Sequence, residues 1–178
     1  MISKKLSAGQ QFPTLSVDKL EGGKLDFLNP KGDCDWLLVI VYRGKHCSLC
    51  NKYLSTLNEL LPQFNELGVD VVAMSADPKE KALIQMNEIN PSFEVGYDLT
   101  IEQMKTLGLY ISNPRSEAET DRPFAEPGLF VINSSNNIQL IDISNAPFLR
   151  PELTSVIRGL GLIRNPENKY PIRGTLTY

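Results

Sequence analysis

The chain has 178 residues, of which 42% are hydrophobic and 22% are charged, and its formal net charge is -3. These values are typical of one globular domain, taken as residues 1–178, that buries about two-thirds of its unfolded surface without needing disulfide cross-links. The small negative charge gives no electrostatic reason to expect nucleic-acid binding, so we expect no nucleic-acid partner.

The sequence gives no indication of export or of a membrane span. Residues 1–8 contain two lysines but reach Gly9 before any apolar stretch develops, so we expect no secretory signal. The longest apolar run, Trp36–Tyr42, is about a third of the length that a membrane-crossing helix needs. We therefore expect a cytoplasmic protein with no membrane partner.

The first 30 residues are predicted to form an N-terminal extension. Two short segments, Thr14–Val17 and Lys24–Phe27, flank the turn-forming residues Glu21-Gly22-Gly23. This pattern predicts a β-hairpin ahead of the main fold.

A strand, a helix and a second strand are predicted next. Trp36–Tyr42 is apolar without alternation, which favours a central parallel strand covered on both faces. The following apolar positions recur with helical spacing up to Gly68, at residues 50, 53, 54, 57, 60, 61, 64 and 67. Pro62 lies inside this helix and should bend it. Val69–Met74 then completes a right-handed βαβ unit.

The remaining elements alternate in type, which predicts an α/β fold with a mixed sheet. They are a helix over Asp77–Ile89 that Pro78 begins, a strand over Phe93–Tyr97, a helix over Ile101–Leu107, a hairpin of strands 129–132 and 138–143, a helix over Pro151–Leu162, and an irregular tail over 164–178.

One long segment before the strand at 129 has no apolar period. Residues 112–127 carry three prolines and several charged side chains, so we expect an exposed polar loop. Its composition predicts mobility, and its connection to the strand at 129 predicts that it borders the substrate entrance.

Cys47 and Cys50 are the candidate catalytic residues. Cys47 falls where the buried strand ends and the long helix begins, a position at which unpaired N–H groups and the helix dipole stabilise a thiolate. Arg43 and Lys45 add positive charge close by. Cys50 lies one turn further along, close enough to form a disulfide with Cys47.

The pair Cys47 and Cys50 has two other interpretations besides redox chemistry. One is that both are ordinary core residues that lie three positions apart by chance. A zinc site is another, but it needs four ligands, whereas the chain offers one CxxC, His46 and the distant Cys34. We expect no metal and no cofactor. Cys34 lies between Asp33 and Asp35, which raise a thiol pKa, so it is expected to be unreactive. His46 either supplies charge or a proton to Cys47 or points to solvent.

The segment Tyr42–Cys50, with the sequence YRGKHCSLC, resembles the RGxWCxxC motif of the peroxiredoxin-like branch of the alkyl hydroperoxide reductase and thiol-specific antioxidant family, with His46 in place of the usual tryptophan. The similarity extends to residues 9–13, 72–77, 97–98 and 127–132. It implies a thioredoxin-like fold, a nucleophile at Cys47, a resolving thiol at Cys50 and a cis proline at Pro127 facing them.

The resemblance also suggests which residues contact the substrate and what the partners are. The expected substrate-binding residues are Arg43, Lys45, His46, Glu126 and Pro127. The expected substrate is a peroxide or a protein disulfide, and the expected electron donor is a thiol system of the thioredoxin or glutathione kind.

Two departures from the family pattern bear on the substrate. Ordinary peroxiredoxins place Pro and Thr at the positions of Ile40 and Gly44, and their later arginine has no match nearer than Arg122. Without these donors, charge that develops on peroxide oxygens is not stabilised. Disulfide exchange without significant peroxidase activity therefore stays open beside peroxide reduction, as does a non-catalytic redox-sensing or binding module.

Overall fold

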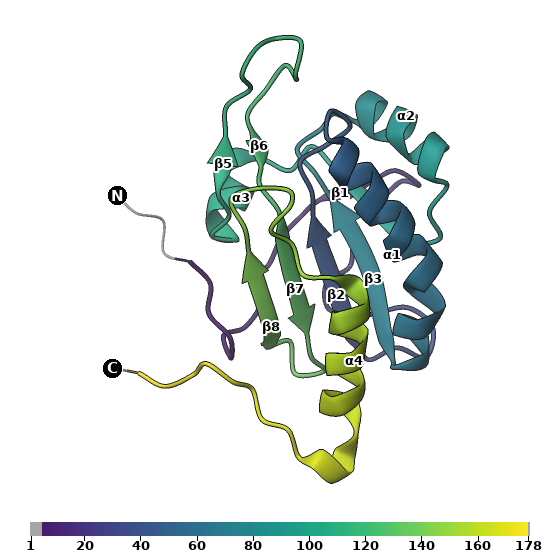
Figure 1. Ribbon diagram of the computed structural model, residues 1–178, viewed down its shortest axis with the longest axis vertical. Coiled ribbons are helices and arrows are strands. Elements are labelled where there is room, and N and C mark those ends of the chain that lie inside the picture. The colour runs from purple at the N-terminus through teal and green to yellow at the C-terminus, as the bar shows by residue number, and fades with distance from the viewer. Residues whose placement is uncertain (1–4, 178) are drawn as a thin grey trace.

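Strand β2 (Trp36–Val41), helix α1 (Ser48–Glu66) and strand β3 (Val69–Met74) form the βαβ unit that the sequence predicts. This is seen in a computed structural model, which describes residues 5–177 of the chain (Figure 1). β2 and β3 pair in parallel with Trp36 opposite Val69. Leu67 caps α1, and Gly68 follows with a φ of +72°, the left-handed conformation expected of a glycine at a helix end. The junction of β2 and α1 carries both candidate cysteines.

The central sheet has six strands in the order β1-β4-β3-β2-β7-β8. β7 (Gly128–Ile132) runs antiparallel to β2, and β8 (Ile138–Ile143) runs antiparallel to β7. β4 (Glu94–Tyr97) is parallel to β3, so the sheet is mixed, as predicted. The other elements are α2 (Lys79–Ile89), α3 (Ile101–Thr106), β5 (Ile111–Ser112), β6 (Phe124–Ala125), α4 (Leu153–Arg164) and the 3-10 turn η1 (Pro166–Asn168).

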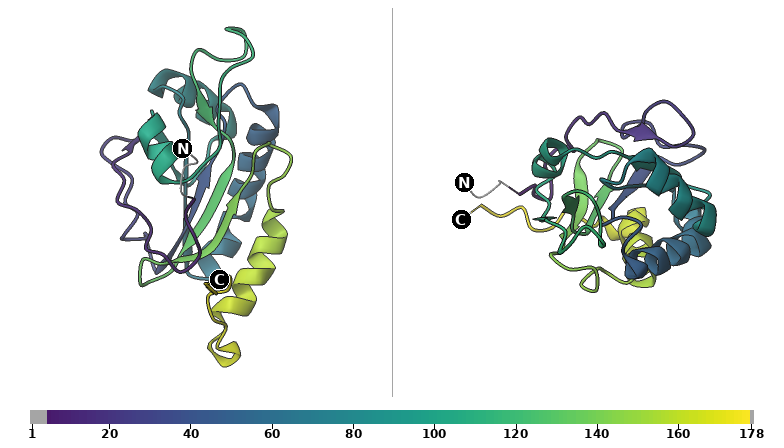
Figure 2. Two further views of the ribbon diagram at one scale, coloured as in Figure 1. Left: turned by 90° about the vertical axis from the view of Figure 1, so that its left-hand side faces the viewer. Right: turned by 90° about the horizontal axis from the view of Figure 1, so that it is seen from above.

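Two apolar layers cover the two faces of the sheet. On one face, α1, α2 and α4 pack against the alternate side chains Leu38 and Ile40 of β2. On the other face, α3 and the N-terminal segment pack against Leu37, Val39 and Val41. Figure 2 shows α1, α2 and α4 on one side of the sheet and α3 on the other. Because both faces are buried, β2 has no polar position, which explains its unbroken apolar run.

The N-terminal segment differs from the predicted hairpin. Its pairing is limited to one bridge, between Asp18 and Lys24, with bonds from the Leu25 N–H to the Val17 carbonyl and from the Lys19 N–H to the Gly23 carbonyl, and a turn bond from the Gly22 N–H to the Lys19 carbonyl. The strand β1 (Asp18–Lys19) instead pairs antiparallel with β4. The segment therefore adds an edge strand to the main sheet, because β4 offers a longer row of unpaired backbone groups than the short turn does.

The ends of the chain are partly as expected. Beyond η1 the tail contains no regular element up to residue 177, and α4 continues two residues past the predicted limit. Residues 1–4 of the predicted extension and Tyr178 of the tail lie outside the described residues. No helix in the described part of the chain is long and apolar enough to cross a bilayer.

Candidate active site

Cys47 is the N-cap residue of α1, and its thiol group satisfies one of the free backbone groups of the helix. The Cys50 N–H donates to Cys47 Sγ over 3.2 Å. Cys47 is 4% exposed and Cys50 is fully buried, and both are free thiols. A helix N-terminus leaves four N–H groups unpaired, so an anionic sulfur is stabilised at this position.

The two thiols have opposite pKa shifts. The hydrogen bond between the Cys50 thiol and Cys47 Sγ is the largest influence on Cys47 and lowers its pKa from 9.0 to about 6. Burial opposes this shift, whereas the bond from the Cys50 N–H and the charges of Arg43 and Arg150 assist it. The hydrogen bond between the two thiols, together with burial, raises the pKa of Cys50. The arrangement therefore holds Cys47 as a thiolate and Cys50 as its protonated partner at neutral pH.

This split predicts the pH dependence of alkylation. In a Cys34→Ser background, we expect the iodoacetamide rate at Cys47 to reach half its maximum near pH 6, because only the thiolate reacts and the Cys47 pKa is lowered to about 6. At pH 7 roughly nine-tenths of Cys47 should then be ionised, against a few per cent of an ordinary thiol. Mass spectrometry of quenched samples gives the rate at each cysteine. A half-maximum near pH 8.5 would contradict the assignment.

Arg43 is held between two carboxylates. Its Nε lies 3.2 Å from Glu126 Oε2, and its Nη2 lies 3.7 Å from Glu119 Oε1. The guanidinium also lies 4.8 Å from the centre of the Phe124 ring. Glu126 is buried, and its Oε1 accepts a hydrogen bond from Ser112 Oγ over 2.6 Å. Two predicted substrate-binding residues, Arg43 and Glu126, are therefore brought together as an ion pair.

Lys45 and His46 lie at the entrance to α1 but differ in what they contact. The Lys45 side chain is exposed, while its backbone N–H donates to Asp77 Oδ2 over 2.6 Å. The His46 ring packs on Phe124 with 4.5 Å between ring centres. Burial and then the charge of Arg43 lower the His46 pKa, which keeps the imidazole neutral at pH 7. His46 is thus half-buried against Phe124. Its position lies between the two alternatives that the sequence left open, which were a side chain that acts on Cys47 and one that points to solvent.

Asp77 is a site residue to which the sequence assigned no role. It follows β3, is 2% exposed, and its pKa is raised by burial. Gly44 has a φ of +134° and lies so close that a Cβ on it would come within 2.7 Å of Asp77 Oδ2. The Asp77 carboxylate therefore packs against the backbone of the turn formed by residues 43–47, and only a glycine fits at position 44, where the carboxylate and the turn are in contact.

Pro127 reaches the site, but the prediction of a cis bond there is wrong. No cis peptide bond occurs among residues 5–177. Val41 pairs with Gly128, so Pro127 lies beside the start of the YRGKHCSLC segment. The Glu126 N–H donates to the Tyr110 carbonyl and the Pro127 carbonyl accepts from Ser144. The chain is extended from β6 to β7 and makes no turn at the Glu126–Pro127 bond. The bond therefore adopts the trans form, which is favoured by about 0.5–1 kcal/mol.

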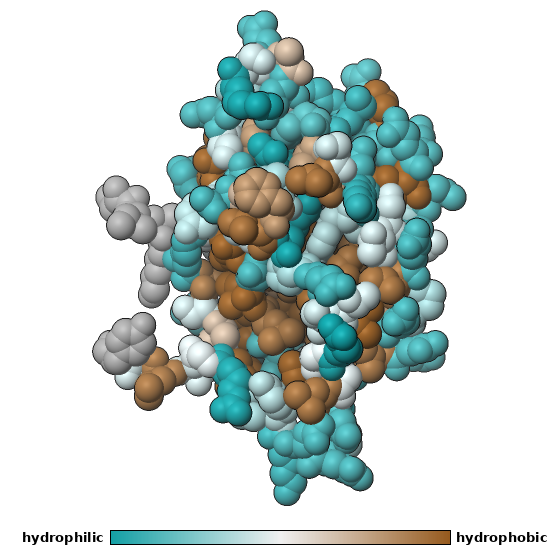
Figure 3. All heavy atoms as spheres, in the orientation of Figure 1, coloured by the Kyte–Doolittle hydropathy of each residue, from teal (hydrophilic) through white to brown (hydrophobic). Residues whose placement is uncertain are grey.

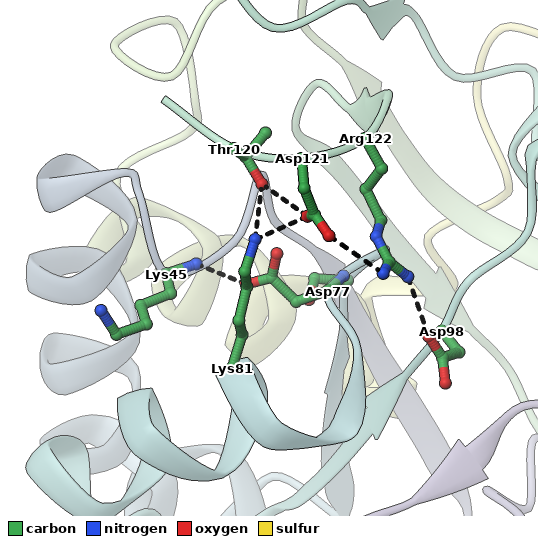
Figure 4. A network of polar contacts seen from close by, with 8 residues as sticks. Lys45, Asp77, Lys81, Asp98, Thr120, Asp121 and Arg122 are labelled. Atoms are coloured by element: carbon green, nitrogen blue, oxygen red, sulfur yellow. Dashed lines mark hydrogen bonds and ion pairs between the residues drawn. The ribbon is translucent and has the colours of Figure 1, made fainter. Parts of the chain in front are cut away.

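The loop between β5 and β6 lies against the turn that carries Arg43, Lys45 and His46, and it is less exposed than expected. β5 and β6 pair with each other, and Thr120 is buried. Figure 4 shows Asp121 directed to Lys81, and Arg122 between Asp121 and Asp98. These ion pairs tie the loop to α2 and to the end of β4. Arg122, the nearest counterpart of the family arginine, is thus engaged with carboxylates.

Arg150 is a second residue that the sequence did not single out. It follows β8 and lies about a hundred residues from the cysteines, so no local pattern connects them. Its guanidinium lies 4.3 Å from the centre of the Tyr53 ring on α1, and its Nε donates to the Pro147 carbonyl over 3.0 Å. Its charge lowers the pKa of Cys47 and also acts on Cys50.

Cys34 lies apart from the pair, before β2, where its Sγ is 3.9 Å from Asn65 Oδ1. Burial raises its pKa, and Asp70, Asp33 and Asp35 raise it further. The expected upward shift is confirmed, with burial and Asp70 as causes beyond the two neighbouring aspartates.

A mixed sheet with a cysteine pair at the junction of a central parallel strand and its helix defines a thioredoxin-like fold. Residues 8–141 match the model of the AhpC/TSA family, and the chain belongs to that family. The resemblance found in the sequence is therefore confirmed.

Curated relatives include the thiol-disulfide oxidoreductase ResA of Bacillus cereus, which is 29% identical over 112 residues, covering 62% of this chain and 61% of the relative. ResA of Bacillus thuringiensis is 31% identical over 107 residues, covering 60% of each chain. The chain thus spans about three-fifths of the length of these relatives.

Solved structures with a similar fold include peroxiredoxin 6 of Arenicola marina, with a TM-score of 0.73, 19% identity, and coverage of 91% of this chain and 75% of that one. A peroxiredoxin-like protein from Aquifex aeolicus also gives a TM-score of 0.73, with 17% identity and coverage of 90% and 89%. At these identities the likeness supports the fold alone.

Proposed function

We propose that this protein is a thiol–disulfide oxidoreductase in which Cys47 is the nucleophile and Cys50 the resolving thiol. The observation that carries the proposal is a pair of free, buried thiols at the N-terminus of α1, where the Cys50 N–H donates to Cys47 Sγ; the pKa values of the two thiols are shifted in opposite directions. Disulfide exchange requires a nucleophilic thiolate next to a second thiol that resolves the mixed disulfide, and Cys47 and Cys50 are placed for these two roles.

The reaction consists of two exchanges. Cys47 thiolate attacks one sulfur of a substrate disulfide, forms a mixed disulfide and releases the other substrate sulfur as a thiolate. Cys50 then loses its proton and attacks Cys47 Sγ, which releases the second substrate sulfur and leaves a Cys47–Cys50 disulfide. The substrate gains two electrons, and an external thiol donor, such as a thioredoxin or glutathione system, restores the two thiols. We retain the cytoplasm as the expected location.

Peroxide reduction is the second candidate, and membership of the AhpC/TSA family favours it. In that reaction Cys47 would become a sulfenic acid, and Cys50 would condense with it and release water. Ile40 and Gly44 stand at the positions of the peroxide-binding Pro and Thr, and Arg43 and Arg122 are both paired with carboxylates. The missing threonine hydroxyl and the pairing of these two arginines support disulfide exchange as the principal activity.

Two rate measurements distinguish the candidates. We expect the reduced protein to reduce insulin disulfides with dithiothreitol as donor, and to lose its free thiols only slowly when mixed with hydrogen peroxide in quenched-flow measurements. Fast oxidation by peroxide together with no insulin reduction would reverse the ranking. Absence of both reactions, with an ordinary Cys47 pKa, would favour a non-catalytic module.

The β5–β6 loop gives a further prediction. A pocket of about 380 Å³ lies between the loop residues Glu119 and Thr120 and the entrance residues Lys45 and His46. Deleting residues 114–121 leaves three residues between the paired positions Ser112 and Phe124, a common hairpin length, so the fold should persist. We expect the rate with insulin to fall several-fold more than the rate with hydroxyethyl disulfide, because only the protein substrate needs a docking surface. Equal changes for both substrates would make the loop a spacer.

A further inference from the structure

A groove lies beside the cysteine pair, between the first turns of α1 and the segment that joins β8 to α4. It has a volume of about 300 Å³ and is lined on α1 by Leu49, Lys52 and Tyr53. Phe148, Arg150 and Glu152 line the opposite side. Leu49 stands between the two cysteines in the chain, and the charge of the groove residue Arg150 acts on both thiols, so the groove adjoins the turn of α1 that carries them.

The rim of the groove is apolar and exposed. Leu49 is 45% exposed, Phe148 is 74% exposed and Leu149 is 56% exposed. Figure 3 shows hydrophobic side chains gathered on this face of the molecule, the face that carries α4 and β8. Exposed side chains of this size, placed beside a reactive group, are typical of a surface that a partner covers.

Arg150 has donor capacity that the protein itself does not use. Its Nη1 is buried and has no hydrogen-bond partner, and no carboxylate of residues 5–177 lies within ion-pair distance of its guanidinium. Arg43, the other arginine that acts on Cys47, is in contrast paired with Glu126 and Glu119. A buried, unsatisfied guanidinium nitrogen favours binding of an external acceptor.

The other charges that face the groove are consistent with an acidic occupant. Lys52 is exposed and adds a second positive charge. The one acidic residue, Glu152, is engaged by the hydroxyls of Thr154 at 2.6 Å and Ser155 at 3.1 Å. An acidic side chain entering the groove therefore meets two cations and one carboxylate that is already hydrogen-bonded.

We propose that this groove binds an extended segment of a partner protein whose disulfide cysteine is flanked by an apolar and an acidic residue, and that Arg150 selects the acidic residue. The proposal rests on disulfide exchange as the function and names its substrate class. The apolar residue packs on Leu49 and Phe148, while the carboxylate accepts from the Arg150 guanidinium. Arg150 forms and breaks no covalent bond, and the electrons pass between sulfurs as described above. It is a specificity residue.

Two matched peptides test the proposal. Both have the form Gly-Leu-X-Cys-X-Leu-Gly with the cysteine joined by a disulfide to 2-mercaptoethanol, where X is Glu in one peptide and Lys in the other. We expect the wild-type protein to reduce the Glu peptide about tenfold faster, in kcat/KM, than the Lys peptide, because one charge-assisted contact is gained. Arg150→Gln should bring the ratio close to one, and Arg150→Lys should retain most of it.

The ratio separates recognition from a general loss of reactivity. Arg150→Gln also raises the Cys47 pKa and slows every substrate, including hydroxyethyl disulfide, but a uniform loss leaves the ratio unchanged. Arg158→Gln is the matched control, since it removes one positive charge from α4 at a residue that does not line the groove; Arg158 donates to Ser155 and its charge also acts on Glu152. An unchanged ratio in Arg150→Gln, or the same loss in Arg158→Gln, would overturn the proposal.

Binding without chemistry distinguishes failure of this inference from failure of the proposed function. Peptides with serine in place of cysteine bind but cannot react, and calorimetry measures their affinity for the reduced protein. We expect the Glu peptide to bind several-fold more tightly than the Lys peptide in the wild type and equally in Arg150→Gln. Preferential binding of the Glu peptide without any turnover would contradict only the proposed oxidoreductase function. Turnover without any preference in rate or affinity would contradict only the proposed role of Arg150.

Discussion

Replacing Cys47 with serine is expected to lower the rate of insulin reduction by about a thousandfold or more, because an alcohol at this position is not ionised at neutral pH and cannot attack a disulfide. The Cys50→Ser variant should instead keep the first attack. Its Cys47 retains the bond from the residue 50 N–H, and the serine hydroxyl can donate in place of the Cys50 thiol, so the thiolate persists and a mixed disulfide accumulates.

Intact-mass measurement after incubation with a disulfide substrate tells the two variants apart. Cys50→Ser should gain the mass of one substrate thiol, and Cys47→Ser should gain none. Cys34→Ser is the control, since Cys34 lies outside the pair and its raised pKa leaves it protonated. If Cys50 is alkylated faster than Cys47 in the wild type, the roles of the two thiols are reversed.

The Arg43→Met substitution should lower both stability and reactivity. It removes the counter-ion of Glu126, whose side chain is only 6% exposed. Breaking a buried ion pair from one side costs about 3 kcal/mol in the free energy of unfolding, because the remaining carboxylate stays buried without its partner. The Cys47 pKa should rise as well, since Arg43 is one of the charges that lower it. Chemical denaturation and the pH profile of alkylation give the two quantities.

A double variant separates the two effects of Arg43. Arg43→Met with Glu126→Gln should recover most of the lost stability, because a neutral amide can keep the bond from Ser112 and carries no charge to bury. The Cys47 pKa should stay high. Arg115→Met is the control: Arg115 is 86% exposed, and its ion pair with Glu119 should contribute little to stability. Recovery of the Cys47 pKa in the double variant would show that Arg43 acts on the thiol only through Glu126.

The fold could be predicted largely from local patterns. The apolar run of β2, the helical stripe of α1 and the glycine after it are each determined by residues close in sequence, and the structure confirms them to within one or two residues. The placement of β1 could not be predicted, because its pairing with β4 joins segments nearly 80 residues apart. Local turn residues favour a hairpin, but the open edge of the sheet determines the pairing.

The site residues likewise divide into those that local sequence identifies and those that only the tertiary fold brings to the site. Cys47, Cys50 and Arg43 lie in one short segment, so the position of the strand end and helix start is enough to identify them. Asp77 and Arg150 reach the segment from β3 and from the end of β8, and only the tertiary fold brings them there. The cis proline rested on resemblance without support from the residues around it.

The hydrogen bond from the α1 backbone to Cys47 Sγ also sets the direction in which electrons tend to flow. This bond and the nearby arginines stabilise the thiolate, which exists only in the reduced protein; once the disulfide forms, the charge is gone and their stabilisation is lost. The reduction potential of the pair is therefore raised. Each unit by which the Cys47 pKa falls raises the potential by about 30 mV at a pH above both the shifted and the ordinary pKa. Among dithiols that differ only in this thiolate, the protein is the stronger electron acceptor.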